Sequence, residues 1–309
     1  MEKFSLHDVR LLESPFLAAQ NADMEYMLSL DADRILAPYL IDAGIPTDTE
    51  RYPNWENSGL DGHTGGHLLS ALAMMYASTG DKEVFERLNY MIDQLEMCQE
   101  KNGNGYVGGV PGGQEIWEEI SRGNINAGNF SLNHKWVPLY NIHKLYAGLR
   151  DAYLIGEISK AKPMLIALTD WMIDVTKDLT DEQVQEMLIS EHGGLNEVFA
   201  DVYAITGDRK YMDLAHRFSD RRILDPLLHE EDVLTGMHAN TQIPKVIGYN
   251  RIGILEGDEE WISSARYFWG NVTEKRTVSI GGNSVREHFN PVDGITGYTP
   301  SPRQVFGVV

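Results

Sequence analysis

A cluster of indole, acid and imidazole side chains lies early in the sequence. It comprises Trp55, Glu56, Asp61, His63 and His67. An indole ring packs on the apolar face of a sugar, and neighbouring polar groups hold the sugar hydroxyls, so we expect Trp55, Asp61 and His63 to bind a carbohydrate. His63 and His67 are four residues apart, a spacing that could also ligate a metal ion. Ordinary polar residues at a helix start are the more common explanation of that spacing.

Three further single histidines lie near the starts of predicted helical hairpins. They are His143, His192 and His238. A single histidine in such a place is more often a hydrogen-bonded structural residue than a ligand. Because the three occupy corresponding positions, we expect them to share a sugar-binding pocket.

Glu287 is the candidate for acid/base chemistry. It lies between Arg286 and His288, shortly after the glycine turn at Gly281. A glutamate in a pocket can be tuned to donate a proton to a leaving group. The simpler alternative is a surface ion pair between Arg286 and Glu287.

A glycine-rich loop runs from Gly105 to Glu115, with Trp117 after it. Glycines permit a close approach of the backbone to a ligand, but they are equally typical of a flexible connection. The sequence contains no P-loop, no dinucleotide-binding fingerprint and no His-Glu-x-x-His zinc motif. The single cysteine, Cys98, cannot form an intrachain disulfide, and its apolar helical surroundings predict a packed core thiol.

Charge and hydropathy exclude some partners. The net charge is −20, from 26 basic and 46 acidic residues. Such an excess repels phosphate backbones, so we expect no nucleic-acid partner. No run of roughly 18 apolar residues predicts a transmembrane helix, so we expect no membrane partner. The first residues lack the apolar stretch of a signal peptide, which indicates a cytoplasmic protein as written, or a periplasmic one if a leader has been removed. The localisation stays open.

An internal repeat predicts the fold class. Tyr76 to Asp81 and Tyr203 to Asp208 share the pattern Tyr-Ala-x-Thr-Gly-Asp, with weaker copies at Tyr153 to Glu157 and Ile254 to Asp258. In each copy we expect the glycine to end one helix and the acid to start the next, which makes a helical hairpin. The period is about 50 residues, longer than that of common solenoids. We therefore expect an all-α fold of the (α/α)6-toroid type; an open solenoid is the alternative.

The expected helices are too few for a complete ring. Nine spans are predicted: 14–30, 63–79, 83–99, 138–154, 160–178, 186–205, 209–220, 236–254 and 259–270. A toroid of six hairpins needs twelve. Residues 277–283 carry β-branched side chains before a glycine turn and should be extended. We expect a partial barrel domain over residues 1–293 and an irregular, divergent tail over residues 294–309.

At this point the chain resembles the β-L-arabinofuranosidase group of glycoside hydrolases, family 127 and its relative family 146. The resemblance covers residues 5–293, and the order of its motifs is more specific than any single one. The matching segments are Phe16, Leu28 to Arg34, Trp55 to Glu56, Leu60 to His63, Tyr140 to Lys144, Gly193 to Glu197, His238 to Lys245 and Gly281 to Phe289.

The resemblance implies an (α/α)6 barrel that retains configuration while hydrolysing terminal β-L-arabinofuranosides. It implies Glu287 as the general acid/base, with His143, His238 and less directly His192 binding the sugar. Family members use a cysteine nucleophile held on zinc. No residue here matches that nucleophile or the zinc ligands, because the sequence diverges after Asp293. We therefore expect no zinc or other cofactor in this chain, and little activity from the chain alone.

Other functions stay open. A carbohydrate-binding pseudoenzyme would keep the pocket without hydrolysis. Another toroid enzyme, such as a sugar epimerase or an unsaturated glucuronyl hydrolase, would need facing His or Asp residues. A purely structural helical-repeat protein would leave the polar clusters unexplained. The expected partner is a glycan containing L-arabinofuranose, and an incomplete ring would expose apolar helix faces that favour self-association.

Overall fold

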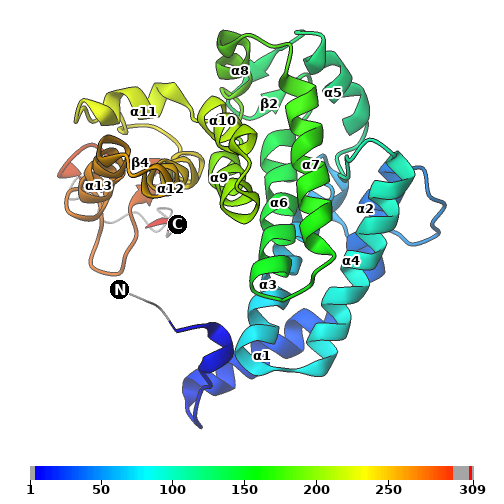
Figure 1. The fold of residues 1–309 in the computed structure, drawn as a ribbon. Coiled ribbons are helices and arrows are strands. Elements are labelled where there is room, and N and C mark those ends of the chain that lie inside the picture. Colours follow the sequence, from blue (N-terminus) through cyan, green and yellow to red (C-terminus); the bar gives the residue numbers. More distant parts are fainter. Residues whose placement is uncertain (1–3, 295–305, 308–309) are drawn as a thin grey trace. The chain divides into compact units, whose positions relative to one another are not determined.

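The computed structural model describes residues 4–294 and the backbone of residues 306–307, and all structural statements refer to these. They form thirteen α-helices and a few two-residue strands (Figure 1). The chain divides into two compact units, residues 1–183 and 184–309, each described by itself below. Among the described helices, none combines the length and the apolar character needed to cross a membrane.

The first unit contains helices α1 to α7. Two 3-10 turns, η1 (Leu6–Asp8) and η2 (Asn54–Asn57), and a two-stranded hairpin of β1 (Ala127–Gly128) and β2 (Ser131–Leu132) complete it. The α-helices are α1 (Pro15–Ser29), α2 (Ala32–Asp42), α3 (His63–Thr79), α4 (Lys82–Asn102), α5 (Gly113–Ser121), α6 (Pro138–Leu154) and α7 (Ala161–Thr176). Helix α8 (Asp181–Met187) spans the division between the units.

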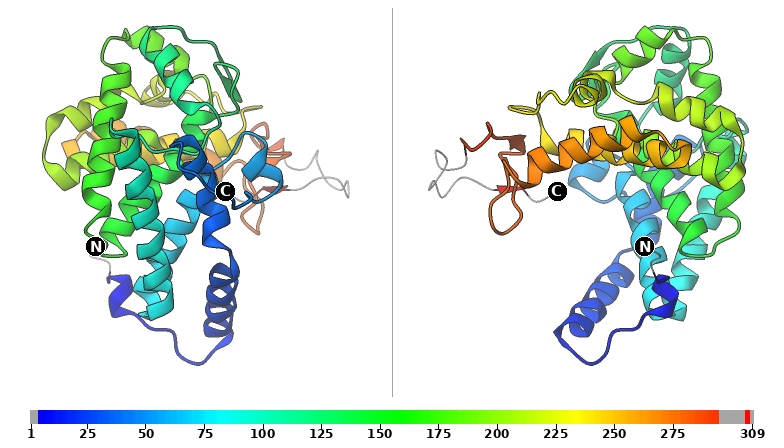
Figure 2. Two further views of the ribbon diagram at one scale, coloured as in Figure 1. Left: turned by 90° about the vertical axis from the view of Figure 1, so that its right-hand side faces the viewer. Right: turned by 60° about the vertical axis from the view of Figure 1, so that its left-hand side comes forward.

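Helices α3 and α6 pack unusually closely in the first unit. Figure 2 gives two further views of the helices. A Cβ atom added to Gly66 would lie 2.1 Å from the carbonyl carbon of Lys144, and one added to Gly148 would lie 2.6 Å from the carbonyl oxygen of Gly66. Only glycine allows the two backbones this distance. The pair is therefore a rigid base for the residues at the start of each helix.

The predicted hairpin turns are confirmed at three places. Gly80, Gly207 and Gly257 adopt left-handed φ angles of 74°, 74° and 71° at helix ends. The acid that follows each glycine caps the next helix; Asp81, for example, accepts hydrogen bonds from the backbone of Glu83 and Val84. Glycine pays no steric cost for a positive φ, and a carboxylate satisfies the free N–H groups of a helix start.

The fourth copy of the repeat differs from the expectation. Helix α6 ends at Leu154 and Glu157, not Gly156, has the positive φ of 57°. A Cβ on Gly156 would lie 2.8 Å from Leu88 Cδ2 and 2.9 Å from the carbonyl oxygen of Ala152. Gly156 is therefore needed for space, whereas Glu157 makes the turn.

The second unit is built from two hairpins and a connecting helix. Its core joins α11, α12 and α13 to the C-terminal hairpin through Leu224, Val246, Tyr249, Phe268 and Phe289. The helices are α9 (Leu195–Thr206), α10 (Arg209–Arg217), α11 (Arg221–Leu228), α12 (Ala239–Glu256) and α13 (Glu259–Thr273). Strand β3 (Ser284–Val285) pairs antiparallel with both β4 (His288–Phe289) and β5 (Phe306–Gly307).

Two sequence-based expectations need correction. Nine helices were expected, but α2, α5, α8 and α11 were missed, and the span 186–205 was too long because α9 begins only at Leu195. Residues 277–283 are turn and loop, and the extended backbone begins at Ser284. Of the predicted tail, only Gly294 and the backbone of residues 306–307 lie within the described residues.

Candidate functional site

The start of α3 holds a buried carboxylate and an imidazole in contact. Glu56, on η2, accepts hydrogen bonds from the backbone N–H of Gly62 (2.7 Å) and of Thr64 (2.9 Å). Its Oε1 also lies 2.7 Å from Nδ1 of His63. Burial alone raises the pKa of Glu56, but the hydrogen bonds from His63, Thr64 and Gly62 outweigh it and hold the pKa below its usual value. Glu56 is therefore an ionised, immobile carboxylate.

Two exposed tryptophans flank this pair. Trp55 is 61% exposed and Trp136 is 39% exposed. Their ring centroids are 6.3 Å apart with an interplanar angle of 66°, and the Trp55 ring centroid lies 6.2 Å from that of His63. Exposed indoles beside a buried polar pair have the surface properties that a sugar ring requires. Sequence analysis had given Trp136 no role.

Asp61 holds the loop before α3 in place. Its side chain is fully buried and accepts hydrogen bonds from Arg51 and from the backbone N–H of Gly59 (2.9 Å). Its backbone carbonyl accepts a hydrogen bond from Asn141 of α6 (2.9 Å). A carboxylate with these partners positions the backbone of the loop. Direct contact of Asp61 with a sugar stays a prediction.

The glycine-rich loop packs directly against the residues that precede α3. A Cβ on Gly109 would lie 2.9 Å from the carbonyl oxygen of Asp61 and 3.0 Å from Cα of Gly62. A Cβ on Gly105 would lie 2.5 Å from the carbonyl oxygen of Ala167. These glycines therefore serve a close approach of backbone to backbone within the protein.

His143 and His67 occupy neighbouring parts of the first unit. His143 is buried on α6, two residues after Asn141. His67 lies one turn after His63 on α3, and their ring centroids are 6.1 Å apart with the rings nearly perpendicular. In the described part of the chain, no group of three His, Cys, Asp or Glu side chains could hold a metal ion.

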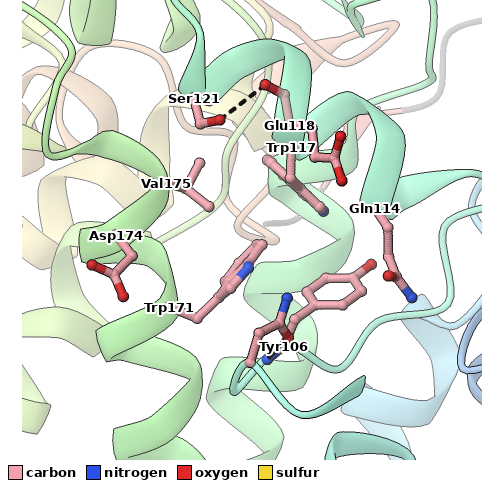
Figure 3. A pocket seen from close by; sticks show the side chains of 9 residues that line it. Tyr106, Gln114, Trp117, Glu118, Ser121, Trp171, Asp174 and Val175 are labelled. Atoms are coloured by element: carbon pink, nitrogen blue, oxygen red, sulfur yellow. Dashed lines mark hydrogen bonds between the residues drawn. The ribbon is translucent and has the colours of Figure 1, made fainter. Parts of the chain in front are cut away.

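The first unit also has a hollow of about 250 Å³ lined by aromatic side chains (Figure 3). Trp171 lies beside Tyr106 and Trp117, with ring centroids 4.7 Å and 5.4 Å away. All three side chains are at least nine-tenths buried. Because almost no ring surface is free for stacking, this hollow is a weaker sugar site than the one around Trp55.

In the second unit, His192 belongs to a buried charged cluster. The ring is fully buried before α9, and its Nδ1 lies 2.9 Å from the carbonyl oxygen of Ser190. Burial and then the charge of Lys245 lower the pKa of His192 to about 3, so the ring is neutral. The sequence predicts that His192 binds a sugar, but the structure buries the His192 ring completely. That role stays a prediction.

Asp220 and Lys245 form the centre of this cluster. Nζ of Lys245 lies 2.8 Å from Oδ2 of Asp220, and the guanidinium of Arg222 donates to the same carboxylate at 2.7 Å and 3.0 Å. Burial raises the pKa of Asp220, but Arg222 and Lys245 outweigh it and hold the pKa well below its usual value. Burial lowers the pKa of Lys245 despite the nearby carboxylate. The cluster joins the start of α11 to α12.

His238 and Glu287 lie together at the start of α12. Oε2 of Glu287 is 3.4 Å from Nε2 of His238, whose Nδ1 is 2.8 Å from Oγ1 of Thr241. The backbone carbonyl of Glu287 accepts a hydrogen bond from Ala239 (2.7 Å). The carboxylate side chain is 66% exposed, whereas His238 is 14% exposed. Glu287 therefore pairs with His238, and the described residues show no ion pair between it and Arg286.

The local backbone explains how Glu287 projects. It occupies the two-residue turn between β3 and β4, where Arg286 and Glu287 have φ angles of 49° and 68°. Positive φ at both central residues defines a type I′ hairpin turn, which strongly prefers Asn-Gly. Two non-glycine residues there are strained, and such strain often marks functional sites.

The structure thus brings the predicted residues together in two groups. Trp55, Asp61, His63 and the first residues of α6 belong to the first unit, and His238 and Glu287 belong to the second. Whether the three histidines share one pocket stays a prediction. Sequence analysis assigned no role to Glu56, Thr241 or Asp220. The position of Glu56 beside Trp55 was its only signal, and Asp220 resembles an ordinary helix cap.

Zinc, which the resemblance associates with these enzymes, does not fit the residues described. Cys98 is buried in α4, and burial raises the pKa of its thiol to about 12. Zinc binds the thiolate form of cysteine, so this thiol is not a ligand.

Comparisons with known proteins agree with this architecture. A comparison with curated proteins gave no match. A solved GH127 β-arabinofuranosidase is similar with a TM-score of 0.63 and 16% identity, over 93% of this chain and 46% of that one. A GH127 β-L-arabinofuranosidase from Geobacillus stearothermophilus T6 gives 0.60 and 15%, over 89% and 46%. The present chain spans about half the length of both.

These similarities show the fold and confirm the all-α toroid type over the open solenoid. The profile described as "Beta-L-arabinofuranosidase, GH127 catalytic domain" matches residues 8–300, nearly the whole sequence. The chain therefore belongs to the GH127 β-L-arabinofuranosidase catalytic-domain family.

Proposed function

We propose that this chain is a catalytic-domain portion of a retaining glycoside hydrolase that acts on glycans with terminal β-L-arabinofuranosyl units. Family membership supports the reaction class. The observation that carries the proposal is the solvent-facing carboxylate of Glu287, held 3.4 Å from His238 on a strained turn. Trp55, His63, His143 and His238 are the proposed sugar-binding residues; His192 and Asp61 are the candidates whose side chains are most enclosed.

Glu287 would act twice in a retaining reaction. As an acid it protonates the leaving-group oxygen, and as a base it activates the water that releases the sugar. His238 suits both stages because imidazole can donate from or accept at Nε2, depending on its tautomer. The Thr241 hydroxyl at Nδ1 can likewise donate or accept. The pair is therefore compatible with either protonation state of Glu287.

The second group of a retaining mechanism is a nucleophile, and Cys98 cannot serve because its thiol is buried and protonated. We therefore expect the 309-residue chain to bind a β-L-arabinofuranoside without appreciable turnover. An added nucleophile such as azide can take the place of a cysteine thiolate. It would attack the anomeric carbon as the leaving group departs with a proton from Glu287, and it would leave a glycosyl azide.

The test is cleavage of methyl β-L-arabinofuranoside by the chain with and without azide. Azide should restore cleavage, and Glu287→Gln should reduce the restored rate about 100- to 10,000-fold, the usual contribution of a general acid. Glu274→Gln, a change at an exposed acid that ends α13 in the same unit, is the control. Sugar binding with no azide-dependent cleavage would contradict the hydrolase proposal and favour the pseudoenzyme. Turnover without azide would show that a side chain other than Cys98 serves as the nucleophile.

A further inference from the structure

Glu56 lies against the imidazole of His63, and the role proposed for it below rests on the proposed binding of a glycan. Nδ1 of His63 lies 2.7 Å from the carbonyl oxygen of Leu60 and 2.7 Å from Oε1 of Glu56. Neither a carbonyl nor an ionised carboxylate can donate a hydrogen bond. Nδ1 must therefore carry a proton, and in the neutral ring Nε2 has none.

Glu56 is held too firmly to turn away from this imidazole. Two backbone N–H groups, of Gly62 and Thr64, bind its two oxygens, and its side chain is 5% exposed. The hydrogen bonds keep the pKa of Glu56 low, so the carboxylate stays charged. Hydrogen bonds to an ionised acceptor are about twice as strong as neutral ones. Between the two acceptors at Nδ1, Glu56 therefore dominates.

Nε2 of His63 belongs to a ring that lies beside the exposed indole of Trp55. It has no hydrogen-bond partner among the described residues, and it is not one of their buried unpartnered atoms, so solvent reaches it. The exposed Trp55 ring lies beside the imidazole, and Trp136 stands against Trp55 at a steep angle. The fixed negative charge of Glu56 disfavours anionic ligands.

We propose that Glu56 is a positioning residue that keeps His63 in the Nδ1–H tautomer, so that Nε2 accepts a hydrogen bond from a hydroxyl of a sugar seated on Trp55. Because the carboxylate holds the proton on Nδ1, Nε2 of the imidazole is a hydrogen-bond acceptor. An acceptor at this position favours a ligand group that can donate, such as a hydroxyl. This assigns the direction of one hydrogen bond in the sugar site.

The first experiment measures the tautomer by two-bond ¹H–¹⁵N correlation spectroscopy on the full chain at mildly alkaline pH. His63 should show a protonated Nδ1 and an unprotonated Nε2, with its signals assigned by their loss in His63→Asn. Glu56→Gln should populate the tautomer with the proton on Nε2. Its NH₂ group replaces one acceptor oxygen of the carboxylate with a donor, which disfavours a proton on Nδ1. Glu86→Gln, an exposed carboxylate on α4, is the control. A protonated Nε2 in the unaltered chain, or an unchanged tautomer in a folded Glu56→Gln, would overturn the proposal.

The second experiment needs no change at Glu56. Calorimetry compares methyl β-L-arabinofuranoside with analogues in which one hydroxyl is replaced by fluorine, which cannot donate. One analogue should bind about three- to tenfold more weakly, the usual range for one neutral hydrogen bond. His63→Asn should abolish this difference, because its amide can still bind Glu56 but does not reach the Nε2 position, whereas His67→Asn should retain it.

The outcomes separate the two proposals. If the parent sugar binds and all analogues bind equally well, the acceptor role of His63 is wrong while the proposed function stands. If no sugar binds, the proposed function fails in this chain, and the acceptor role fails with it. The tautomer measurement is independent of both, because it reports on Glu56 and His63 without a ligand.

Discussion

The buried imidazole of His192 should make the second unit sensitive to acid. Its pKa is about 3 in the folded protein, against 6.5 for an ordinary histidine. Between these two pH values the His192 ring is protonated in the unfolded chain and neutral in the folded protein. A group with a lowered pKa contributes stability that is present above pH 6.5 and is lost as the pH falls toward 3.

The size of the effect follows from these two values. Between pH 7 and pH 4, the unfolded state gains about 3 kcal/mol from protonating this ring. His192→Asn removes the titration, and its amide nitrogen can take the place of Nδ1 and donate to Ser190. The substitution has a packing cost, but that cost is the same at every pH. The pH dependence of the difference between the two proteins is therefore the diagnostic quantity.

The assay is native-state hydrogen exchange of peptides from α9 and α12, which reports the opening free energy of the second unit alone. His192→Asn should lose about 3 kcal/mol less than the unaltered chain between pH 7 and pH 4. His229→Asn, at an exposed histidine of the same unit, should follow the unaltered chain. If His192→Asn and the unaltered chain lose stability in parallel, the ring is not a neutral buried group and the reasoning is refuted.

Three further predictions concern packing, strain and association. Gly66→Ala should destabilise the first unit by about 3 kcal/mol because its Cβ would meet the backbone of Lys144. Gly207→Ala, which has open space but a positive φ, should destabilise the protein by about 1 kcal/mol. Equal losses of stability in urea unfolding would contradict the close-packing argument. Glu287→Gly should stabilise the protein by about 1 kcal/mol while removing the proposed acid/base. Glu157→Gly, at a similar φ of 57°, should stabilise the protein equally without affecting sugar binding. A Glu287→Gly variant that is less stable than the unaltered chain would show that the turn is not strained. Exposed apolar side chains support a proposal of self-association, and the most exposed of them in the N-terminal segment are Phe4, Leu12 and Phe16. The mass measured by light scattering should therefore increase as the protein concentration increases. A constant monomer mass would count against self-association.

Some elements could be read from short stretches of sequence because their cause is local. Glycine followed by aspartate ends one helix and caps the next, and this holds at Gly80, Gly207 and Gly257. Helix α8 also has a local signal in the sequence. Thr180 and Gln183 exchange hydrogen bonds as a capping box, which their spacing predicts. A helix start needs only the three or four residues around it.

Other features depended on segments far apart in the chain. Helix α5 begins where the glycine-rich loop ends, and its buried Trp117 packs against Trp171 of α7, more than fifty residues further along the chain. Gly156 was expected to make a turn, but its role is to leave room for Leu88. Such contacts are decided by the tertiary structure, and residue type alone does not reveal them.

The candidate site divides in the same way. The sequence by itself determined the family motifs, the hairpin repeat and the supply of histidines and acids, because these depend on residue type and spacing. Only the tertiary structure decided that His192 is enclosed, that Glu287 meets His238, and that Glu56 holds His63. Burial and hydrogen-bond partners determine which nitrogen of an imidazole carries the proton and whether a carboxylate is charged, and both come from residues that the fold brings together.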